Sequence, residues 1–304
     1  MKLGFVSAIL GELSFEEMID FAADNKLECV EVCCWPKGKA VRRYAGVTHI
    51  DADTLDEEKC ACIQRYLKEK GVEISSLAYY PNTMEPDKEK RDIYIGHLHK
   101  LIDASAKLGI NMVTTFIGRD SKKTVSENLE LIKEIWPPIL DHAKEKGVKV
   151  AIENCPMLFT EDEWPGGQNL MTTPAIWRKV FKILDYDNFG LNYDPSHFVW
   201  QQIDYIKPLY EFKEKIFHVH YKDIKIYKEK LEDVGIMATS LQYMAPKLPG
   251  LGDVNWGKYV SALTDIGYQG YTCIEVEDKA FENSIEDAKK AVILSAGYLK
   301  NFIA

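Results

Sequence analysis

The sequence alternates short apolar runs with longer amphipathic runs, and the alternation repeats eight times along its 304 residues. The apolar runs are typical of strands and span residues 3–10, 29–34, 73–80, 111–118, 149–154, 189–194, 216–223 and 271–277. The amphipathic runs are typical of helices and lie near 14–25, 54–70, 87–108, 123–146, 173–184, 199–213, 256–267 and 284–302. This order indicates a parallel sheet, and near-continuous apolar strands indicate burial on both faces. We therefore predict an α/β fold in which residues 1–304 form a single (β/α)8 barrel; an open doubly wound sheet is the alternative.

Residues that begin and end helices support these boundaries. Ser14 and Glu17 have the spacing of a capping box, and Thr173 followed by Pro174 is typical of a helix start. Gly71 follows a lysine-rich helix end, where a glycine often stops a helix. No low-complexity linker interrupts the chain, so we expect no domain boundary. Three longer segments, 35–53, 155–172 and 224–255, follow strands and are expected at the mouth of the barrel.

Composition argues against several classes of protein. The net charge is −9 and the pI is about 5.4, whereas a nucleic-acid-binding protein normally carries a basic patch. No run of about 18 apolar residues occurs, so we expect no membrane-spanning helix, and residues 1–17 read as a first strand rather than a signal peptide. The seven cysteines are odd in number and several lie in apolar runs, which favours free thiols in a reducing cytoplasm.

Four consecutive strands end in side chains that can bind metal. These residues are Glu153, Asp194, His220 and Glu275. One such residue alone is more often solvated, salt-bridged or hydrogen-bonded in a core, but the ends of barrel strands converge on one mouth. Three carboxylates would then face each other without a cluster of basic residues to neutralise them, and a divalent cation is the simplest compensation. Oxygen-rich ligation with one nitrogen favours Mn²⁺, Mg²⁺ or Co²⁺ over a thiolate-type zinc site.

Residues beside these strand ends allow more than one interpretation. His218 and His220 share a face of one strand, and the deeper His218 is expected to pack below or to orient a ligand. Lys222 and Asp223 could form an ion pair that braces the mouth, or take part in catalysis. Trp35 could stack on a sugar or belong to the core.

The glycine-rich segment 249–256 also has two interpretations. It could close over a substrate, or it could lead into the next helix with Asn255 as the cap. Glycine spacing alone is too weak to indicate phosphate binding.

Sequence blocks around these residues resemble a known family. They are IEN (152–154), GLNYDPSHFVWQ (190–201), FHVHYKD (217–223), PGLGDVNW (249–256) and GYQGYTCIEVED (267–278). In these blocks the chain resembles the sugar phosphate isomerase/epimerase family, part of the xylose isomerase-like TIM barrel superfamily that also contains ketohexose 3-epimerases and endonuclease IV. The similarity covers nearly the whole chain and does not specify one substrate.

The resemblance implies roles for single residues. Glu153, Asp194, His220 and Glu275 fall on the family's metal ligands, which implies one divalent ion, with Mn²⁺ first and Mg²⁺, Co²⁺ or Zn²⁺ as alternatives. Glu153 and Glu275 would also be the acid and base on opposite faces of the substrate. His197 falls on a substrate-binding histidine of the family. Beside it, we expect Asn154, Lys222 and Trp35 to contact the substrate.

We therefore predict a metal-dependent isomerase or epimerase that transfers a proton next to a carbonyl, through an enediolate, in a keto-sugar, a 3-keto-glycoside or a sugar acid. The main alternative is a metal-dependent lyase or deglycosidase that acts on a 3-keto-sugar with a small partner subunit. A non-catalytic sugar-binding barrel is less favoured. An AP endonuclease is also less favoured, because the additional histidines of the endonuclease site are missing. Members of the family often associate, so a homo-oligomer is expected.

Three positions depart from the family pattern. Ile226 stands where ketohexose epimerases have an arginine, and Phe159 stands where they have a glutamate. Both differences argue against a free ketohexose as the substrate. Glu277 replaces a histidine that many relatives carry.

Overall fold

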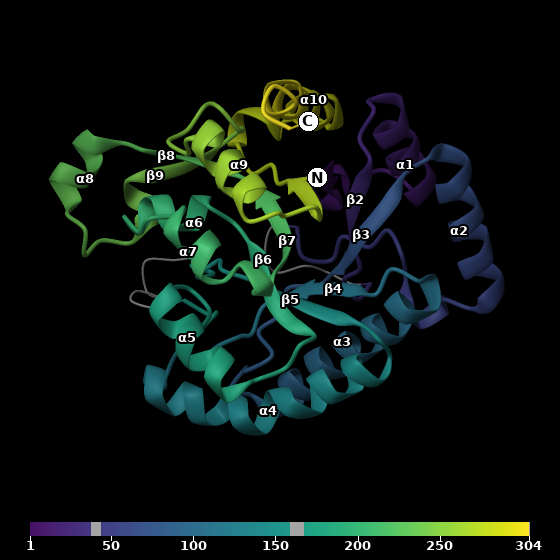
Figure 1. Cartoon of the computed structure of the whole chain (residues 1–304), viewed down its shortest axis with the longest axis horizontal. Helices are drawn as coiled ribbons and strands as arrows, with labels where there is room; N and C mark the ends of the chain where they lie inside the picture. The colour runs from purple at the N-terminus through teal and green to yellow at the C-terminus, as the bar shows by residue number, and fades with distance from the viewer. Residues whose placement is uncertain (38–43, 159–166, 304) are drawn as a thin grey trace.

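A computed structural model describes residues 1–37, 44–158 and 167–303 of the chain. Within these ranges, eight parallel strands close a barrel (Figure 1). In their order around the barrel they are β1 (Lys2–Val6), β10 (Tyr271–Ile274), β7 (Ile216–Tyr221), β6 (Phe189–Tyr193), β5 (Lys149–Glu153), β4 (Met112–Thr115), β3 (Glu73–Ala78) and β2 (Cys29–Cys33). This confirms the predicted (β/α)8 architecture and removes the open sheet as an alternative.

Helices cover the outside of the barrel (Figure 1). The longer ones are α1 (Phe15–Asp24), α2 (Glu57–Lys70), α3 (Lys88–Leu108), α4 (Val125–Glu145), α5 (Pro174–Ile183), α9 (Trp256–Asp265) and α10 (Ile285–Leu299). Short 3₁₀ helices are η1 (Ser7–Leu10), η2 (Ala52–Thr54), η4 (Lys213–Lys215), η5 (Ser240–Gln242) and η6 (Lys279–Phe281). None of the helices within the described ranges has the length and apolar character needed to cross a bilayer.

The predicted capping residues are confirmed at the ends of α1, α2 and α5. Ser14 and Glu17 form both bonds of a capping box at the start of α1. Thr173 caps α5, with Pro174 in its first turn. Gly71 ends α2 with φ +67°, a conformation that a side chain would disfavour. These local choices fix where the chain leaves each helix for the next strand.

One predicted helix was wrong. The run near 199–213 is split into α6 (Ser196–Trp200) and α7 (Lys207–Glu211). Gln202 lies between them with φ +57°, which a continuous right-handed helix cannot contain. The helical periodicity continued across this break because Phe198, Leu209 and Phe212 all pack into the same core.

The segment between β7 and α9 contains regular structure that the sequence did not reveal. β8 (Asp223–Ile226) pairs antiparallel with β9 (Met244–Lys247), and α8 (Lys228–Val234) lies between them. This hairpin projects from one side of the barrel (Figure 1, left). The strand expected over 216–223 therefore ends at Tyr221, and Asp223 already belongs to β8.

The strands separate two cores. Val30 and Val32 on β2 pack in the large outer core against the helices. Cys29 and Cys33 on the same strand belong to a small cluster with Val6 of β1, as period-two alternation requires. Glu31 alternates with Val30 and Val32 and so shares the inward face of β2 with the two cysteines. All seven cysteines are described, and none forms a disulfide.

Candidate active site and metal centre

The four predicted metal ligands, which lie at the ends of β5, β6, β7 and β10, come together at the mouth of the barrel. One ligand atom from each of them lies within 4.8 Å of the others, in the set Glu153, Asp194, His220 and Glu275. His220 Nδ1 lies 3.1 Å from Glu275 Oε2 and 3.8 Å from Glu153 Oε1. The carboxyl ends of parallel barrel strands meet at one face, so residues 122 positions apart in sequence reach the same point.

Three atoms of this set are buried without a hydrogen-bond partner. They are Glu153 Oε1, Asp194 Oδ2 and His220 Nδ1. Leaving a buried polar atom unpaired costs about 1–3 kcal/mol, and more for a charged group. Three such atoms from three strands, all turned toward one point, are the donor set that a divalent cation would satisfy. The residues present therefore fit the metal that the donor chemistry implies.

A lysine enters this acidic set, which the sequence reasoning did not foresee. Lys222 Nζ lies 2.8 Å from Glu275 Oε2, 3.2 Å from Asp194 Oδ2 and 3.8 Å from Glu153 Oε1. It also lies 3.5 Å from Glu277 Oε2. One ammonium neutralises these four carboxylates only in part, so the set keeps a negative charge. The acidic set still attracts a cation, and a bound divalent ion would share its ligands with Lys222.

The expected ion pair between Lys222 and Asp223 is absent, because Asp223 turns the other way. Its carboxylate accepts hydrogen bonds from the backbone N–H groups of Gly250, Gly252 and Val254 and from the indole N–H of Trp256. Burial raises the pKa of Asp223, and these bonds act against that shift.

The Asp223 bonds tie the glycine-rich segment 249–256 to the base of β8. Asn255 caps α9 by accepting a hydrogen bond from Lys258 N at 3.0 Å. None of the residues 249–256 lines the cavity at the barrel mouth. The structure thus supports the interpretation of this segment as a lead-in to the helix rather than as a cover over substrate.

The two glutamates of the site differ electrostatically. Burial acts to raise the pKa of Glu153, but the nearby His197 and His220 rings and the charge of Lys222 hold it well below its usual value. Burial also raises the pKa of Glu275, where it prevails over the nearby Lys222 ammonium. Asp194 is buried too, yet Lys222 and His197 lower its pKa to about 2.

Of the four expected substrate contacts, three line the cavity and one does not. His197 Nε2 lies 3.2 Å from Asp194 Oδ2 and 3.4 Å from Glu153 Oε1, at the edge of the cavity. Lys222 and Trp35 also line the cavity. Asn154 does not: its amide bonds the backbone N–H and C=O of Asp194 at 2.8 and 2.9 Å. It therefore orients a neighbouring strand end, not a molecule in the cavity.

A cavity of about 600 Å³ opens above the carboxylates. Its floor is charged, with Glu153, Lys222 and Glu275. Its walls are mainly apolar and come from the β1, β2, β4, β5 and β6 loops and from the hairpin; they include Trp35, Phe116, Met157, Leu158, Trp200, Leu241 and Met244. Ile226 lies in β8, one of the two hairpin strands, while Phe159 lies outside the described residues.

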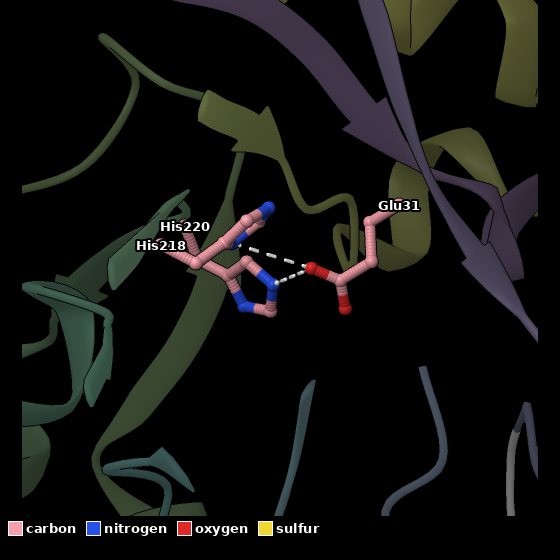
Figure 2. Close-up of side chains that lie close together, drawn as sticks. All are labelled: Glu31, His218 and His220. Carbon is pink, nitrogen blue, oxygen red and sulfur yellow. Dashed lines mark hydrogen bonds and ion pairs between the residues drawn. The ribbon is translucent and has the colours of Figure 1, made fainter. Parts of the chain in front are cut away.

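Sequence reasoning missed Glu31, which lies below the floor. Figure 2 shows its carboxylate turned toward both histidines of β7, with Oε2 at 2.9 Å from His220 Nε2 and 3.4 Å from His218 Nδ1. His218 does lie in the layer below, as expected, bonded to Asn192 and Ser75. A signal for Glu31 existed, because it is the one charged residue within the apolar run 29–34.

Comparison with protein families agrees with the barrel fold. A family model described as a xylose isomerase-like TIM barrel matches residues 19–301. The chain belongs to this family. The closed eight-stranded barrel is the fold that this xylose isomerase-like assignment requires.

Relatives within and around the family differ in activity. The chain is 26% identical over 306 residues to the uncharacterized protein YfiH of Bacillus subtilis, covering 91% of this chain and 93% of that protein. It is 29% identical over 180 residues to an inosose dehydratase of Clostridium perfringens, covering 58% of this chain and 54% of the dehydratase.

Solved structures share the xylose isomerase-like fold. The IOLI protein with a bound zinc atom matches with a TM-score of 0.74 at 18% identity, over all of both chains. The 3-keto-D-glucoside 4-epimerase YcjR of E. coli matches with a TM-score of 0.72 at 16% identity, over 99% of each chain. At such identities the likeness establishes the fold.

Proposed function

We propose that this protein is a divalent-metal-dependent sugar isomerase or epimerase that transfers a proton at the carbon next to a carbonyl group. The observation that carries the proposal is the placement of Glu153 and Glu275. They come from β5 and β10, two strands separated around the barrel by β6 and β7, and both line the floor of one cavity. A substrate seated on that floor would have one carboxylate at each side.

The metal ligands would be Glu153, Asp194, His220 and Glu275, whose donor atoms already converge. A bound divalent ion supplies Lewis acidity, which makes the proton next to a carbonyl easier to remove. An oxygen-rich set with one imidazole favours Mn²⁺, with Mg²⁺, Co²⁺ and Zn²⁺ as alternatives. The zinc atom in the related IOLI structure supports a divalent ion in this fold without selecting one.

The protein's own groups would handle the proton. Glu153, held ionised by its neighbours, is suited to remove it, and Glu275, whose pKa is raised, is suited to return one from the other side. His197, at the rim of the floor, would hydrogen-bond a substrate oxygen. Lys222, which lines the cavity, would contact a substrate oxygen. Epimerisation uses both glutamates, whereas isomerisation could use one of them twice.

The cavity supports a substrate larger than a free hexose. A volume of about 600 Å³ falls in the range of roughly 300–1,000 Å³ found for drug-sized ligands. The charged groups gather at the floor, while Trp35, Trp200 and Met244 make the walls apolar. A keto-sugar that carries an apolar or ring substituent, such as a 3-keto-glycoside, would place its polar ring on the floor and the substituent between the walls. An acidic floor also favours a neutral sugar over a sugar acid.

The test is solvent-deuterium exchange, followed by NMR. The Mn²⁺-loaded protein is incubated in D₂O with ketohexoses, with 3-keto-glucosides bearing methyl or phenyl aglycones, and with keto sugar acids. We expect loss of the proton next to the carbonyl in the 3-keto-glycosides, accompanied by a new epimer. No exchange in any of these compounds would overturn the proposal.

Two variants assign the exchange to the site. Glu153→Gln and Glu275→Gln should each slow exchange at least about 100-fold, since positioned acid–base groups contribute roughly 10²–10⁴ in rate. The matched control is Glu73→Gln, at the opposite end of the barrel, where the carboxylate bonds Lys2. If either site variant exchanged as fast as the control, the two-glutamate scheme would fail.

Dehydration is the second candidate, favoured by the similarity to inosose dehydratase. The same removal of a proton next to a carbonyl, followed by loss of a hydroxyl from the adjacent carbon, gives an enone and water. A product lighter by one water, with the absorbance of an enone and no epimer, would select this lyase reaction. A deglycosidase would instead release the aglycone, and co-purification of a small partner subunit would favour it.

A further inference from the structure

Glu31 is a fully buried carboxylate that no step of the proposed reaction uses. It lies on the inward face of β2, and its side chain has no exposed surface. Its Oε1 accepts a hydrogen bond from the Tyr80 hydroxyl at 2.5 Å. Its Oε2 faces the two histidines of β7, as Figure 2 shows. Burying a carboxylate costs free energy unless hydrogen-bond donors satisfy it. The atoms that face the Glu31 carboxylate therefore indicate where its neighbours carry protons.

The contact with His220 determines which ring nitrogen holds the proton. Oε2 of the Glu31 carboxylate lies 2.9 Å from His220 Nε2, and a carboxylate oxygen accepts hydrogen bonds. His220 Nε2 must therefore donate. The amide of Asn192 also lies 2.9 Å from Nε2, but an amide can be turned either way, whereas the carboxylate has no donor in either orientation.

The other nitrogen of His220 is then left for a metal. A neutral imidazole has one N–H, and with Nε2 protonated the lone pair sits on Nδ1. Nδ1 lies 3.1 Å from Glu275 Oε2 and has no hydrogen-bond partner. It points into the acidic set, while Nε2 points away from it toward Glu31.

The surrounding residues hold Glu31 in this orientation. Tyr80 donates to Oε1. His218 Nδ1 lies 3.4 Å from Oε2, and its Nε2 lies 3.0 Å from Ser75 Oγ. The carboxylate is thus fixed from both sides and cannot turn away from His220.

We propose that Glu31 is a positioning residue that fixes the tautomer of His220 and makes its Nδ1 the metal-binding atom. This inference rests on the metal site of the proposed function. The carboxylate orients the ring and raises the basicity of Nδ1 through the Nε2–H bond. The metal affinity of the floor therefore depends on a strand on the far side of the barrel that supplies no ligand.

The group Glu31, His218 and His220 could itself be read as a second metal site, because its donor atoms lie close together. The hydrogen bonds argue against it. Glu31 Oε2 and His218 Nδ1 both have hydrogen-bond partners in the layer, whereas Glu153 Oε1, Asp194 Oδ2 and His220 Nδ1, which make no hydrogen bond, all lie on the floor above. Glu31 therefore acts as an acceptor for His220.

The first measurement uses the unaltered protein. Histidine-labelled protein loaded with Zn²⁺, which is diamagnetic, is examined by long-range ¹H–¹⁵N NMR, and His220 is assigned from its loss in His220→Gln. We expect Nε2 to carry the proton and Nδ1 to have the shift of a metal-bound nitrogen. A metal-bound Nε2 would overturn the inference.

The second measurement is metal affinity, from competition with a chelator. Glu31→Gln keeps an acceptor without charge, and Glu31→Met removes both. Loss of such a partner typically weakens metal binding about 10- to 100-fold, and we expect the larger effect in Glu31→Met. The matched control is Ser75→Ala, which alters the same buried layer but not the bond to His220, and it should stay within about threefold of wild type.

The outcomes separate this inference from the proposed function. If the wild type binds Zn²⁺ and Glu31→Met binds it equally well, the role of Glu31 is wrong while the metal site stands. If the wild type binds no divalent ion, both are wrong. If metal binding follows our expectation but no sugar exchanges deuterium, the function alone is wrong. Circular dichroism of each variant, His220→Gln included, shows whether it is folded, and the NMR result on the wild type does not depend on the Glu31 variants.

Discussion

Lys222 donates a hydrogen bond of 2.8 Å to Glu275 and so places an ammonium group among the residues that would hold a metal. Because its side chain is almost fully buried, this pair is shielded from solvent. The floor of the cavity is thereby partly neutralised before any ion binds, and the charge that remains sets how strongly an ion is attracted.

Replacing Lys222 by methionine should lower the free energy of unfolding of the metal-free protein by about 3–5 kcal/mol, because buried carboxylates lose their partner. The same change should strengthen binding of Mn²⁺, since the ion no longer shares the floor with an ammonium. Thermal unfolding in EDTA and in Mn²⁺ measures both effects. Lys279→Met, at an exposed position on the cavity rim, is the control. Equal unfolding of the Lys222 variant and wild type in both buffers would contradict this electrostatic account.

Removing a bound divalent ion should destabilise the wild type. An ion present at one hundred times its dissociation constant stabilises the folded state by about 2.7 kcal/mol, which is several degrees in Tm. Asp194→Asn should abolish this dependence, because Asp194 Oδ2 is one of the three unpartnered donor atoms. Calorimetry with and without EDTA is the measurement. A Tm that does not depend on metal in the wild type would leave the donor set without a ligand.

Asp223→Asn should release the segment 249–256. The amide replaces one oxygen with a donor that faces other donors, so several charge-assisted bonds are lost and a loss of about 3 kcal/mol or more in stability is expected. Hydrogen exchange should rise at the amides of Gly250, Gly252 and Val254, which bond the carboxylate. Asp253→Ala, which removes the partner of Ile226 N, is the comparison. Unchanged exchange in 249–256 would mean that the segment holds itself in place.

The cysteines should differ in reactivity. Burial and the nearby Glu31 raise the pKa of Cys33 to about 12, so its thiolate is scarce at pH 8 and its alkylation should increase only as the pH approaches that value. Cys62 is exposed and should react first. Peptide mapping after iodoacetamide treatment at pH 8 and pH 10 tests the order. Labelling of Cys33 at pH 8 as fast as Cys62 would show that the cavity floor is more open than described.

The sequence was sufficient for the parts of the site that depend on topology alone. Strand ends in a parallel barrel meet at one mouth, so Glu153, Asp194, His220 and Glu275 could be grouped before any coordinates. The position of Lys222 could not be predicted this way, because a long flexible side chain can turn toward any of several neighbours.

Other features needed three-dimensional contacts. The strands β8 and β9 have only four residues each, and no tight-turn signal joins them because α8 lies between them. Glu31 was visible as a charge in an apolar run, but its partner His220 lies 189 residues away. A partner at that distance is specified by the closure of the barrel and by no local pattern.

A single residue, Lys222, joins the last barrel strand before the hairpin to the hairpin itself, whose residue Met244 forms part of the cavity wall. One part of the cavity wall thus comes from an appendage, which Asp223 fastens at its base and which adjoins a floor built from other strands. Substitutions along the appendage could retune which aglycone is admitted while the acid–base pair stays untouched. In this architecture, substrate specificity can change while the chemistry of the floor stays the same.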